Sequence, residues 1–240
     1  FLELRGKPVL AHTLLAFQKA RHVDEIVVVA RPEDIEAVWK LAYENGINFI
    51  DTARAYTDSE EKISYAFKGF NEEYPRESII IATKTQSETG EGVLKDIETS
   101  LSNLQTDYVD LYQIHNPSAK DLQQVTAPGG ALEALQEAKA AGKIGHIGIT
   151  LHSADLFREA LDLPWVETFM FPYNIVETQG EALIKRCAEK NIGFVDMKPL
   201  AGGAIEDASL AMRFLVSNPD VTVVIPGMAD AKEIEQNLAA

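Results

Sequence analysis

The sequence is poor in cysteine, in basic residues and in long apolar runs, and each shortage excludes a class of protein. The single cysteine, Cys187, rules out a disulfide scaffold and a cysteine-rich metal or iron–sulfur site. Lys and Arg number 22 against 37 Asp and Glu, and the net charge of −15 argues against nucleic acid or an anionic membrane as a partner. No apolar run approaches the roughly 18 residues that a membrane-spanning helix needs.

The start of the chain carries little targeting information. No signal peptide is visible, so we expect a cytoplasmic protein. The chain begins at Phe1 without a methionine, which suggests the edge of a cut fragment.

What the sequence does contain is an alternation of strands and helices. Eight short runs rich in β-branched and aromatic residues predict strands, at 25–30, 47–50, 79–82, 108–114, 146–149, 167–171, 193–197 and 222–225. The stretches after them have helical spacing, at 31–46, 59–69, 92–104, 130–141, 154–161, 179–190, 207–217 and 230–239. One more helix is expected before the first strand, from about Pro8 to Arg21.

This order of elements predicts the fold. Alternating strands and helices indicate parallel strands with right-handed crossovers. Eight such units in 240 residues favour a single α/β domain over 1–240, a (β/α)8 TIM barrel with an extra N-terminal helix. An open, doubly wound sheet is the alternative.

Four polar residues stand where predicted strands end, which is where a barrel carries its active site. They are Asp51 and Tyr56 after the second strand, Lys84 after the third and His115 after the fourth. A lysine ammonium beside a tyrosine favours the phenolate and lowers the pKa of the phenol, and a carboxylate can hold the lysine in place. The cluster therefore indicates a tuned proton donor.

Each of the four residues also has a structural explanation. Asp51 could cap the following helix, and Lys84 could be the first solvated residue after a strand. Tyr56 could pack in a loop, and His115 could be a hydrogen-bonded rim residue. Their joint position on one face of neighbouring strands favours the catalytic interpretation.

From about residue 39 to 240 the chain resembles the aldo-keto reductases. The segments that carry the resemblance are Gly46–Tyr56, Ile81–Thr85, Asp107–His115, Gly142–Gly148, Met197–Gly203 and Val224–Gly227. The resemblance implies NAD(P)H-dependent reduction of a small carbonyl substrate, with NADP or NAD as cofactor and no metal. It implies that Tyr56 is the general acid, that Lys84 and Asp51 tune it, and that His115 orients the carbonyl.

The same resemblance implies a set of cofactor-binding residues at the ends of the later strands. They are Thr150, Lys198, Leu200, Gly202, Gly227, Met228, Gln236 and Asn237. Two features depart from the family pattern. Met170 stands where relatives often carry a glutamine for the nicotinamide amide, and a thioether cannot donate that hydrogen bond. Near the last helix only Lys232 offers a cation for a 2′-phosphate, among acidic neighbours, which implies weak discrimination between NADP and NAD.

Residues 1 to about 38 resemble a different family, the methylerythritol phosphate cytidylyltransferases, through Phe1–Leu14, Asp24–Ala30 and Pro32–Ile35. The glycine-rich nucleotide loop of that family is absent, so cytidylyl transfer is not expected. The two resemblances together suggest an engineered chimera in which segment 25–30 supplies strand one. Such a splice would impair the reductase, and the alternative function is a fold-chimera scaffold with a vestigial site and no turnover.

Overall fold

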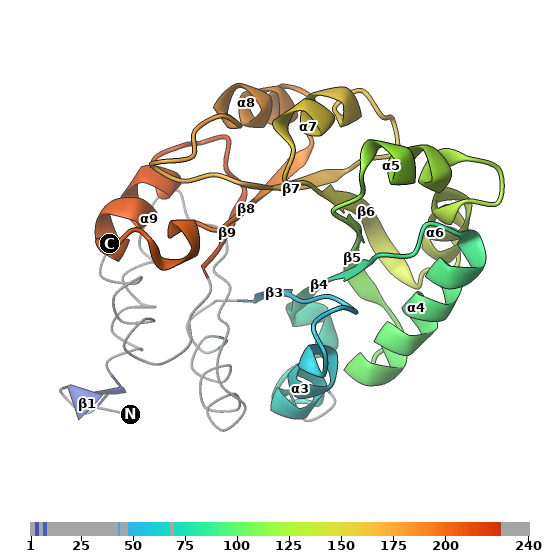
Figure 1. Cartoon of the computed structure of the whole chain (residues 1–240). Coiled ribbons are helices and arrows are strands. Elements are labelled where there is room, and N and C mark those ends of the chain that lie inside the picture. The colour runs from blue at the N-terminus through green and yellow to red at the C-terminus, as the bar shows by residue number, and fades with distance from the viewer. Residues whose placement is uncertain (1–2, 5–6, 9–42, 44–47, 68–69, 227–240) are drawn as a thin grey trace. The chain divides into compact units, whose positions relative to one another are not determined.

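The computed structural model describes residues 3–4, 7–8, 43, 48–67 and 70–226 (Figure 1). The chain divides into two compact units. One is Ile50–Met170, and the other combines Phe1–Phe49 with Phe171–Ala240. The single domain over 1–240 stays a prediction.

The unit Ile50–Met170 carries a parallel sheet in which neighbouring strands follow chain order. Its strands are β3 (Phe49–Asp51), β4 (Ile80–Thr85), β5 (Val109–His115), β6 (Ile144–Thr150) and β7 (Thr168–Pro172). The first residue of β3 and the last two of β7 are assigned to the other unit. The register places Lys84 beside Gln113, His115 beside Thr150, and Thr150 beside Met170. Strand ends that are distant in sequence are therefore brought to one edge of this sheet.

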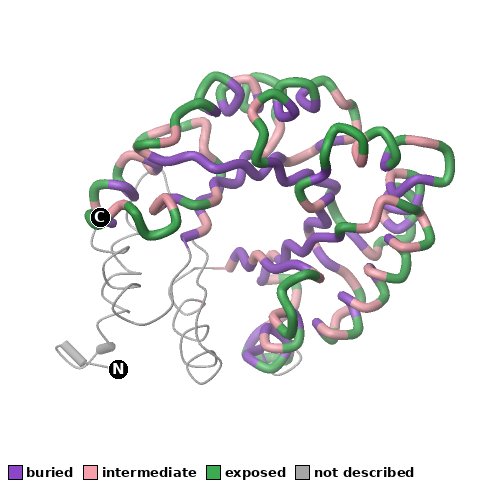
Figure 2. Tube along the Cα trace, viewed as in Figure 1, coloured by how far each residue is buried: buried purple, intermediate pink, exposed green. Residues whose placement is uncertain are grey.

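Helices cover this sheet. They are α3 (Ser59–Ala66), α4 (Gly90–Leu104), α5 (Ala119–Thr126), α6 (Ala131–Ala140) and α7 (Ala154–Ala160), with a short 3-10 turn, η1 (Arg76–Ser78), before β4. Helix α4 packs against α3 and α6, and its inward face is apolar, with Val93, Ile97, Leu101 and Leu104 buried. Figure 2 shows that the strands are largely buried, whereas each helix alternates between buried and exposed residues.

Helix α5 is an α-helix that the sequence did not predict. Only Val125 among its residues is buried, so the apolar spacing that signals a helix is missing. Its start is fixed by a capping box, in which the Ser118 hydroxyl accepts from the Asp121 N–H and the Asp121 carboxylate accepts from the Ser118 N–H.

In the other unit, α8 (Glu181–Glu189) packs against β8 (Gly193–Met197), and β8 pairs in parallel with β9 (Val223–Ile225). Between them lie the 3-10 turn η2 (Ala201–Gly203) and α9 (Ala208–Val216). The short strands β1 (Glu3–Leu4) and β2 (Lys7–Pro8) form an antiparallel pair. The helix expected to begin at Pro8 is therefore wrong at that residue, which pairs with Glu3 instead.

The α/β class and the parallel order of the sheet are confirmed. Strand 25–30 and helix 230–239 lie outside the described residues, as does most of helix 31–46, of which only Tyr43 is described, as helical. The closure of an eight-stranded barrel, which needs strand 25–30, therefore stays a prediction. Within the described parts of the chain, no helix is both long and apolar enough to cross a membrane.

Candidate active site

A buried ion pair joins the ends of β3 and β4. Lys84 Nζ lies 2.5 Å from Asp51 Oδ2 and donates to the carbonyl oxygen of Thr52 at 2.7 Å. The side chains of Lys84 and Asp51 are only 1% and 8% exposed. Lys84 is therefore not a solvated residue at a strand end, and Asp51 acts as the partner of Lys84, not as a helix cap.

Tyr56 and His115 lie next to this ion pair. Lys84 Nζ lies 5.2 Å from the centre of the Tyr56 ring, and the Tyr56 and His115 rings meet edge to face with centres 5.7 Å apart. Tyr56 is 45% exposed, although aromatic side chains of its size usually bury most of their area. A phenol that is held over a buried ammonium yet open to solvent is accessible to a substrate. All four predicted catalytic residues therefore come together, within the unit Ile50–Met170.

The backbone fixes where these side chains stand. The Thr52 and Arg54 N–H groups donate to the carbonyl oxygens of Ala82 and Lys84, so the chain leaving β3 stays attached to β4. After His115, Asn116 adopts a left-handed conformation with φ of 50° and donates its N–H to Thr150. Asparagine tolerates that conformation better than most residues.

Burial is the main cause of the pKa shifts of Asp51, Lys84 and Tyr56. It raises the pKa of Asp51 and lowers the pKa of Lys84, while the ion pair opposes burial in both groups. Burial, and then the negative charge of Asp51, raise the pKa of Tyr56. The pKa of Tyr56 is therefore raised and not lowered, because burial and the charge of Asp51 outweigh the Lys84 ammonium 5.2 Å from the ring.

His115 is kept neutral. Desolvation, followed by the positive charge of Lys84 and the neighbouring His152, lowers the pKa of His115 to about 4. Its buried Nδ1 atom has no hydrogen-bond partner among the described residues. A neutral imidazole carries one N–H donor, which suits it to hydrogen-bond a carbonyl oxygen.

The predicted cofactor residues fall in different parts of the chain. Thr150 is buried at the end of β6, and its hydroxyl accepts the Asn116 N–H at 2.9 Å. Lys198, Leu200 and Gly202 belong to the other unit, where they follow β8. Gly227, Met228, Gln236 and Asn237 lie outside the described residues, as does Lys232.

The turn after β8 has an unusual backbone. Gly202 has φ of 67° and Gly203 has φ of 93°, a region that side chains disfavour, and a Cβ at either residue would meet open space. Lys198 is exposed and also has a positive φ. Open backbone next to a cation fits the close approach of a phosphate group.

Met170 occupies a buried position in β7, paired with Thr150. The side chain at this edge of the sheet therefore brings no hydrogen-bond donor, as the sequence indicated. In the described part of the chain, no group of three or more His, Cys, Asp or Glu side chains is arranged to hold a metal ion.

Two residues that the sequence did not single out support the cluster. Gln113 approaches Asp51 Oδ1 with its amide nitrogen at 3.5 Å, and Glu60 forms a buried network behind the Tyr56 loop. Gln113 could have been found from its place two residues before His115 on a buried strand. Glu60 looks like an ordinary acidic residue in a first helical turn, and its long-range partners leave no local signal.

The comparisons with known proteins identify the family. The model of the Aldo/keto reductase family matches residues 27–209, well over half of the chain. The chain belongs to this family.

Two curated relatives show the degree of similarity. L-galactose dehydrogenase of Arabidopsis thaliana is 27% identical, over 87% of this chain and 78% of the plant protein. Aldo-keto reductase YhdN of Bacillus subtilis is 34% identical, over 63% of this chain and 47% of its own length. This chain thus spans about half the length of the Bacillus protein.

Solved structures agree on the fold. A putative aldo-keto reductase from Pseudomonas aeruginosa superposes with a TM-score of 0.76 at 24% identity, over 89% of this chain and 88% of that one. An aldo-keto reductase from Klebsiella pneumoniae, solved with NADPH, gives a TM-score of 0.71 at 22% identity, over 89% and 84% of the two chains. The parallel α/β architecture is that of solved aldo-keto reductases.

None of these comparisons supports the predicted cytidylyltransferase-like start. The family match begins at residue 27, inside the segment 1–38 that the sequence had suggested was foreign, and includes most of strand 25–30. The resemblance of that segment to a second family rested only on the short sequence stretches Phe1–Leu14, Asp24–Ala30 and Pro32–Ile35.

Proposed function

We propose that this protein reduces a small aldehyde or ketone with NADPH or NADH. The observation that carries the proposal is the assembly of Asp51, Tyr56, Lys84 and His115 at the carboxyl ends of neighbouring strands. A buried lysine–aspartate pair beneath an exposed phenol, with a neutral imidazole at its edge, is arranged for general acid catalysis.

Each side chain has a separate task in this proposal. Tyr56 donates its phenolic proton to the carbonyl oxygen as negative charge develops there. The Lys84 ammonium, fixed by Asp51, offsets the charge left on the phenolate. His115, neutral above about pH 4, donates a hydrogen bond that orients the carbonyl. A bound reduced nicotinamide would supply the hydride.

The residues after β8 are suited to hold such a cofactor. The Gly202–Gly203 backbone and Lys198 fit a phosphate-bearing ligand. The structure from Klebsiella pneumoniae supports NADPH. The acidic surroundings of Lys232 in the sequence support weak preference between NADPH and NADH.

Met170 favours impaired binding of the cofactor. It is buried in β7, and its thioether offers no hydrogen bond to a nicotinamide amide. We expect an enzyme that turns over but binds its cofactor with reduced affinity.

The test begins with cofactor titrations of the whole chain, using NADPH and NADH separately and protein fluorescence as the readout. Oxidation of the bound cofactor is then followed with a panel of aldehydes and ketones. Binding of at least one cofactor and turnover of at least one carbonyl are expected. If neither cofactor binds, the reductase proposal fails and the catalytically silent scaffold is favoured.

A further inference from the structure

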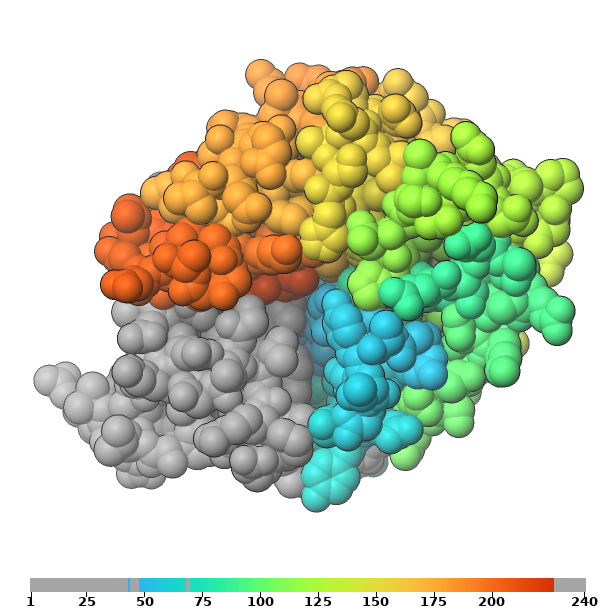
Figure 3. All heavy atoms as spheres, in the orientation of Figure 1, coloured from blue at the N-terminus to red at the C-terminus, as the bar shows by residue number. Residues whose placement is uncertain are grey.

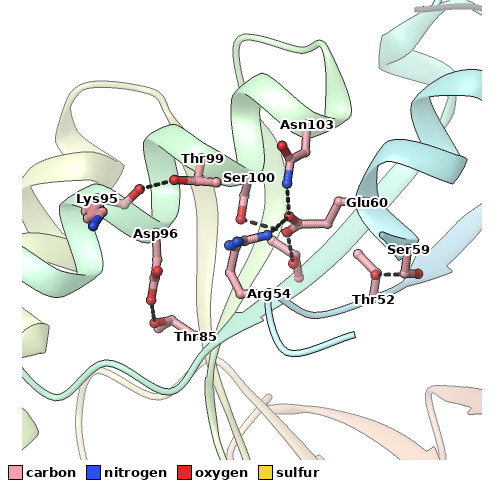
Figure 4. A network of polar contacts seen from close by, with 11 residues as sticks. Thr52, Arg54, Ser59, Glu60, Thr85, Lys95, Asp96, Thr99, Ser100 and Asn103 are labelled. Carbon is pink, nitrogen blue, oxygen red and sulfur yellow. Dashed lines mark hydrogen bonds and ion pairs between the residues drawn. The ribbon is translucent and has the colours of Figure 1, made fainter. Parts of the chain in front are cut away.

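Behind the Tyr56 loop lies a carboxyl group that takes no part in the proposed chemistry. Glu60 stands in the first turn of α3, is 2% exposed and has four donors around its two oxygens. Oε1 accepts from the hydroxyls of Thr83, at 2.8 Å, and Ser100, at 2.7 Å. Oε2 accepts from Arg54 Nη1 at 2.7 Å and Asn103 Nδ2 at 3.1 Å (Figure 4).

These donors come from three different elements. Thr83 lies in β4, Ser100 and Asn103 lie in α4, and Arg54 lies in the loop between β3 and α3. Each partner on β4 and α4 is at least 23 residues away in sequence. A buried carboxylate is costly unless it is fully hydrogen-bonded. The four hydrogen bonds to Glu60 therefore hold the first turn of α3 in one position.

The network encloses the loop that carries Tyr56. Arg54 and Glu60 stand on either side of Tyr56 in sequence, and their ion pair closes the loop. Within it, Tyr56 N–H donates to the Ala53 carbonyl at 3.0 Å, and Ser59 N–H donates to the Tyr56 carbonyl at 2.9 Å. Atoms of the segment around α3 are visible at the surface on the face shown in Figure 3.

The same network reaches the neighbours of Lys84. Side chains alternate along a strand, so Thr83 and Thr85 point away from the face that Lys84 occupies. Thr83 is held by Glu60, and Thr85 donates to Asp96 of α4. The Lys84 carbonyl in turn accepts the Arg54 N–H at 3.0 Å. One set of contacts therefore fixes both the loop of the phenol and the strand of the ammonium.

We propose that Glu60 is a positioning residue that sets the separation of Tyr56 from Lys84 and His115. The inference rests on the proposed function, because it concerns the same proton donor. The role of Glu60 can be tested without turnover, because it concerns where the Tyr56 ring lies when no ligand is bound.

The test uses the titration of Tyr56, followed by NMR in protein labelled with carbon-13 at the tyrosine ring and assigned with Tyr56→Phe. Tyr56 faces Asp51, Lys84 and His115, and burial and Asp51 raise its pKa above the ordinary value. Glu60→Met keeps the length of the side chain and removes all four acceptor contacts. The loop should then open, and the Tyr56 pKa should fall toward about 10.

A conservative variant separates position from bulk stability. In Glu60→Gln the amide oxygen can still face Arg54 and Asn103, and the hydroxyls of Thr83 and Ser100 can turn to accept from the amide nitrogen. We expect its Tyr56 pKa to lie between those of the wild type and Glu60→Met. With cofactor and carbonyl, Glu60→Met should lower kcat on the order of tenfold to a hundredfold with little change in KM.

Asp110→Asn is the matched control, because it breaks a 2.7 Å ion pair with Arg76 at the opposite ends of the strands. It should leave the Tyr56 titration unchanged. An unchanged Tyr56 pKa in folded Glu60→Met, or an equal shift in Asp110→Asn, overturns the proposal. If Glu60→Met does not fold, Asn103→Ala removes one donor and should give a smaller shift in the same direction; no shift there overturns it as well. Absence of turnover in the wild type, with the Tyr56 shift of Glu60→Met still present, would instead count against the proposed function alone.

Discussion

The two ends of the strands in the unit Ile50–Met170 both carry charged clusters, yet burial sets the direction of the pKa shift of the carboxyl group at only one of them. At the amino ends, Glu167 contacts Lys139 at 2.5 Å and His146 at 2.9 Å. Although burial acts to raise it, hydrogen bonds from Lys139 and His146 lower the pKa of Glu167. At the carboxyl ends, desolvation prevails and raises the pKa of Asp51 against the pull of Lys84.

The other amino-end cluster is equally well satisfied. Arg76 donates to Asp110 at 2.7 Å and to the carbonyl of Tyr108 at 2.9 Å, and its guanidinium stacks 4.0 Å from the centre of the Tyr108 ring. All of these contacts hold segments together. Charge alone therefore does not indicate an active site, whereas desolvated groups gathered at one strand edge are candidates for one.

The largest expected effect follows from removing the buried ammonium. Lys84→Met fills the same space without the charge, so the developing phenolate at Tyr56 loses its stabilisation. We expect kcat to fall by about 10²- to 10⁴-fold. Steady-state rates of cofactor oxidation measure this, and a variant with the wild-type rate would contradict the role given to Lys84.

The second prediction compares one aspartate from each end. Asp51→Asn leaves Lys84 as an uncompensated buried charge, which should cost about 3–5 kcal/mol of unfolding free energy and abolish turnover. Asp110→Asn also removes one partner of an ion pair, but the side chains of Asp110 and Arg76 are 29% and 11% exposed. The variant should therefore cost about 1–3 kcal/mol of unfolding free energy without changing kcat. Urea denaturation gives both free energies. Equal losses of stability and activity in the two variants would show that the two ends do not differ as described.

The third prediction concerns pH. His115 titrates near pH 4 in the folded protein and near 6.5 when unfolded, so between these values the unfolded chain binds the proton and the folded one does not. The contribution of His115 to stability is therefore present above about pH 6.5 and is lost as the pH falls to about 4. NMR titration of the ring, assigned with His115→Gln, measures the pKa directly. A value near 6.5 would refute the desolvated imidazole.

The smallest expected effect is a gain. Met170→Gln adds a hydrogen-bonding amide beside Thr150, and one neutral hydrogen bond is worth about 1 kcal/mol, or roughly a fivefold tighter cofactor. Met170→Leu, which adds no donor, is the control. Titration of both variants with NADPH and NADH gives the dissociation constants, and equal values would show that position 170 does not contact the nicotinamide.

Much of the described fold follows from local patterns, because strands buried on both faces are continuous apolar runs. Those at 79–82, 108–114 and 193–197 correspond to β4, β5 and β8. Helix α5 was missed because its start depends on capping and little of it is buried. The pairing of Pro8 with Glu3 was missed because proline also suits a first helical turn.

The site was predictable where the chain order of strands brings residues together, as for Lys84 and His115. Its electrostatics were not, because burial and the charge of Asp51 raise the pKa of Tyr56, and the order of the strands reveals neither. The role of Glu60 depends on contacts 40 and 43 residues away in sequence, which no local spacing reveals.

The most direct test of the account is the rate of cofactor oxidation by Tyr56→Phe beside the wild type, with the best carbonyl of the panel. Phenylalanine keeps the ring that meets His115 edge to face and removes only the hydroxyl group, and with it the proton donor. We expect turnover in the wild type and none above background in Tyr56→Phe, with cofactor binding retained. Equal rates in the two proteins would contradict it.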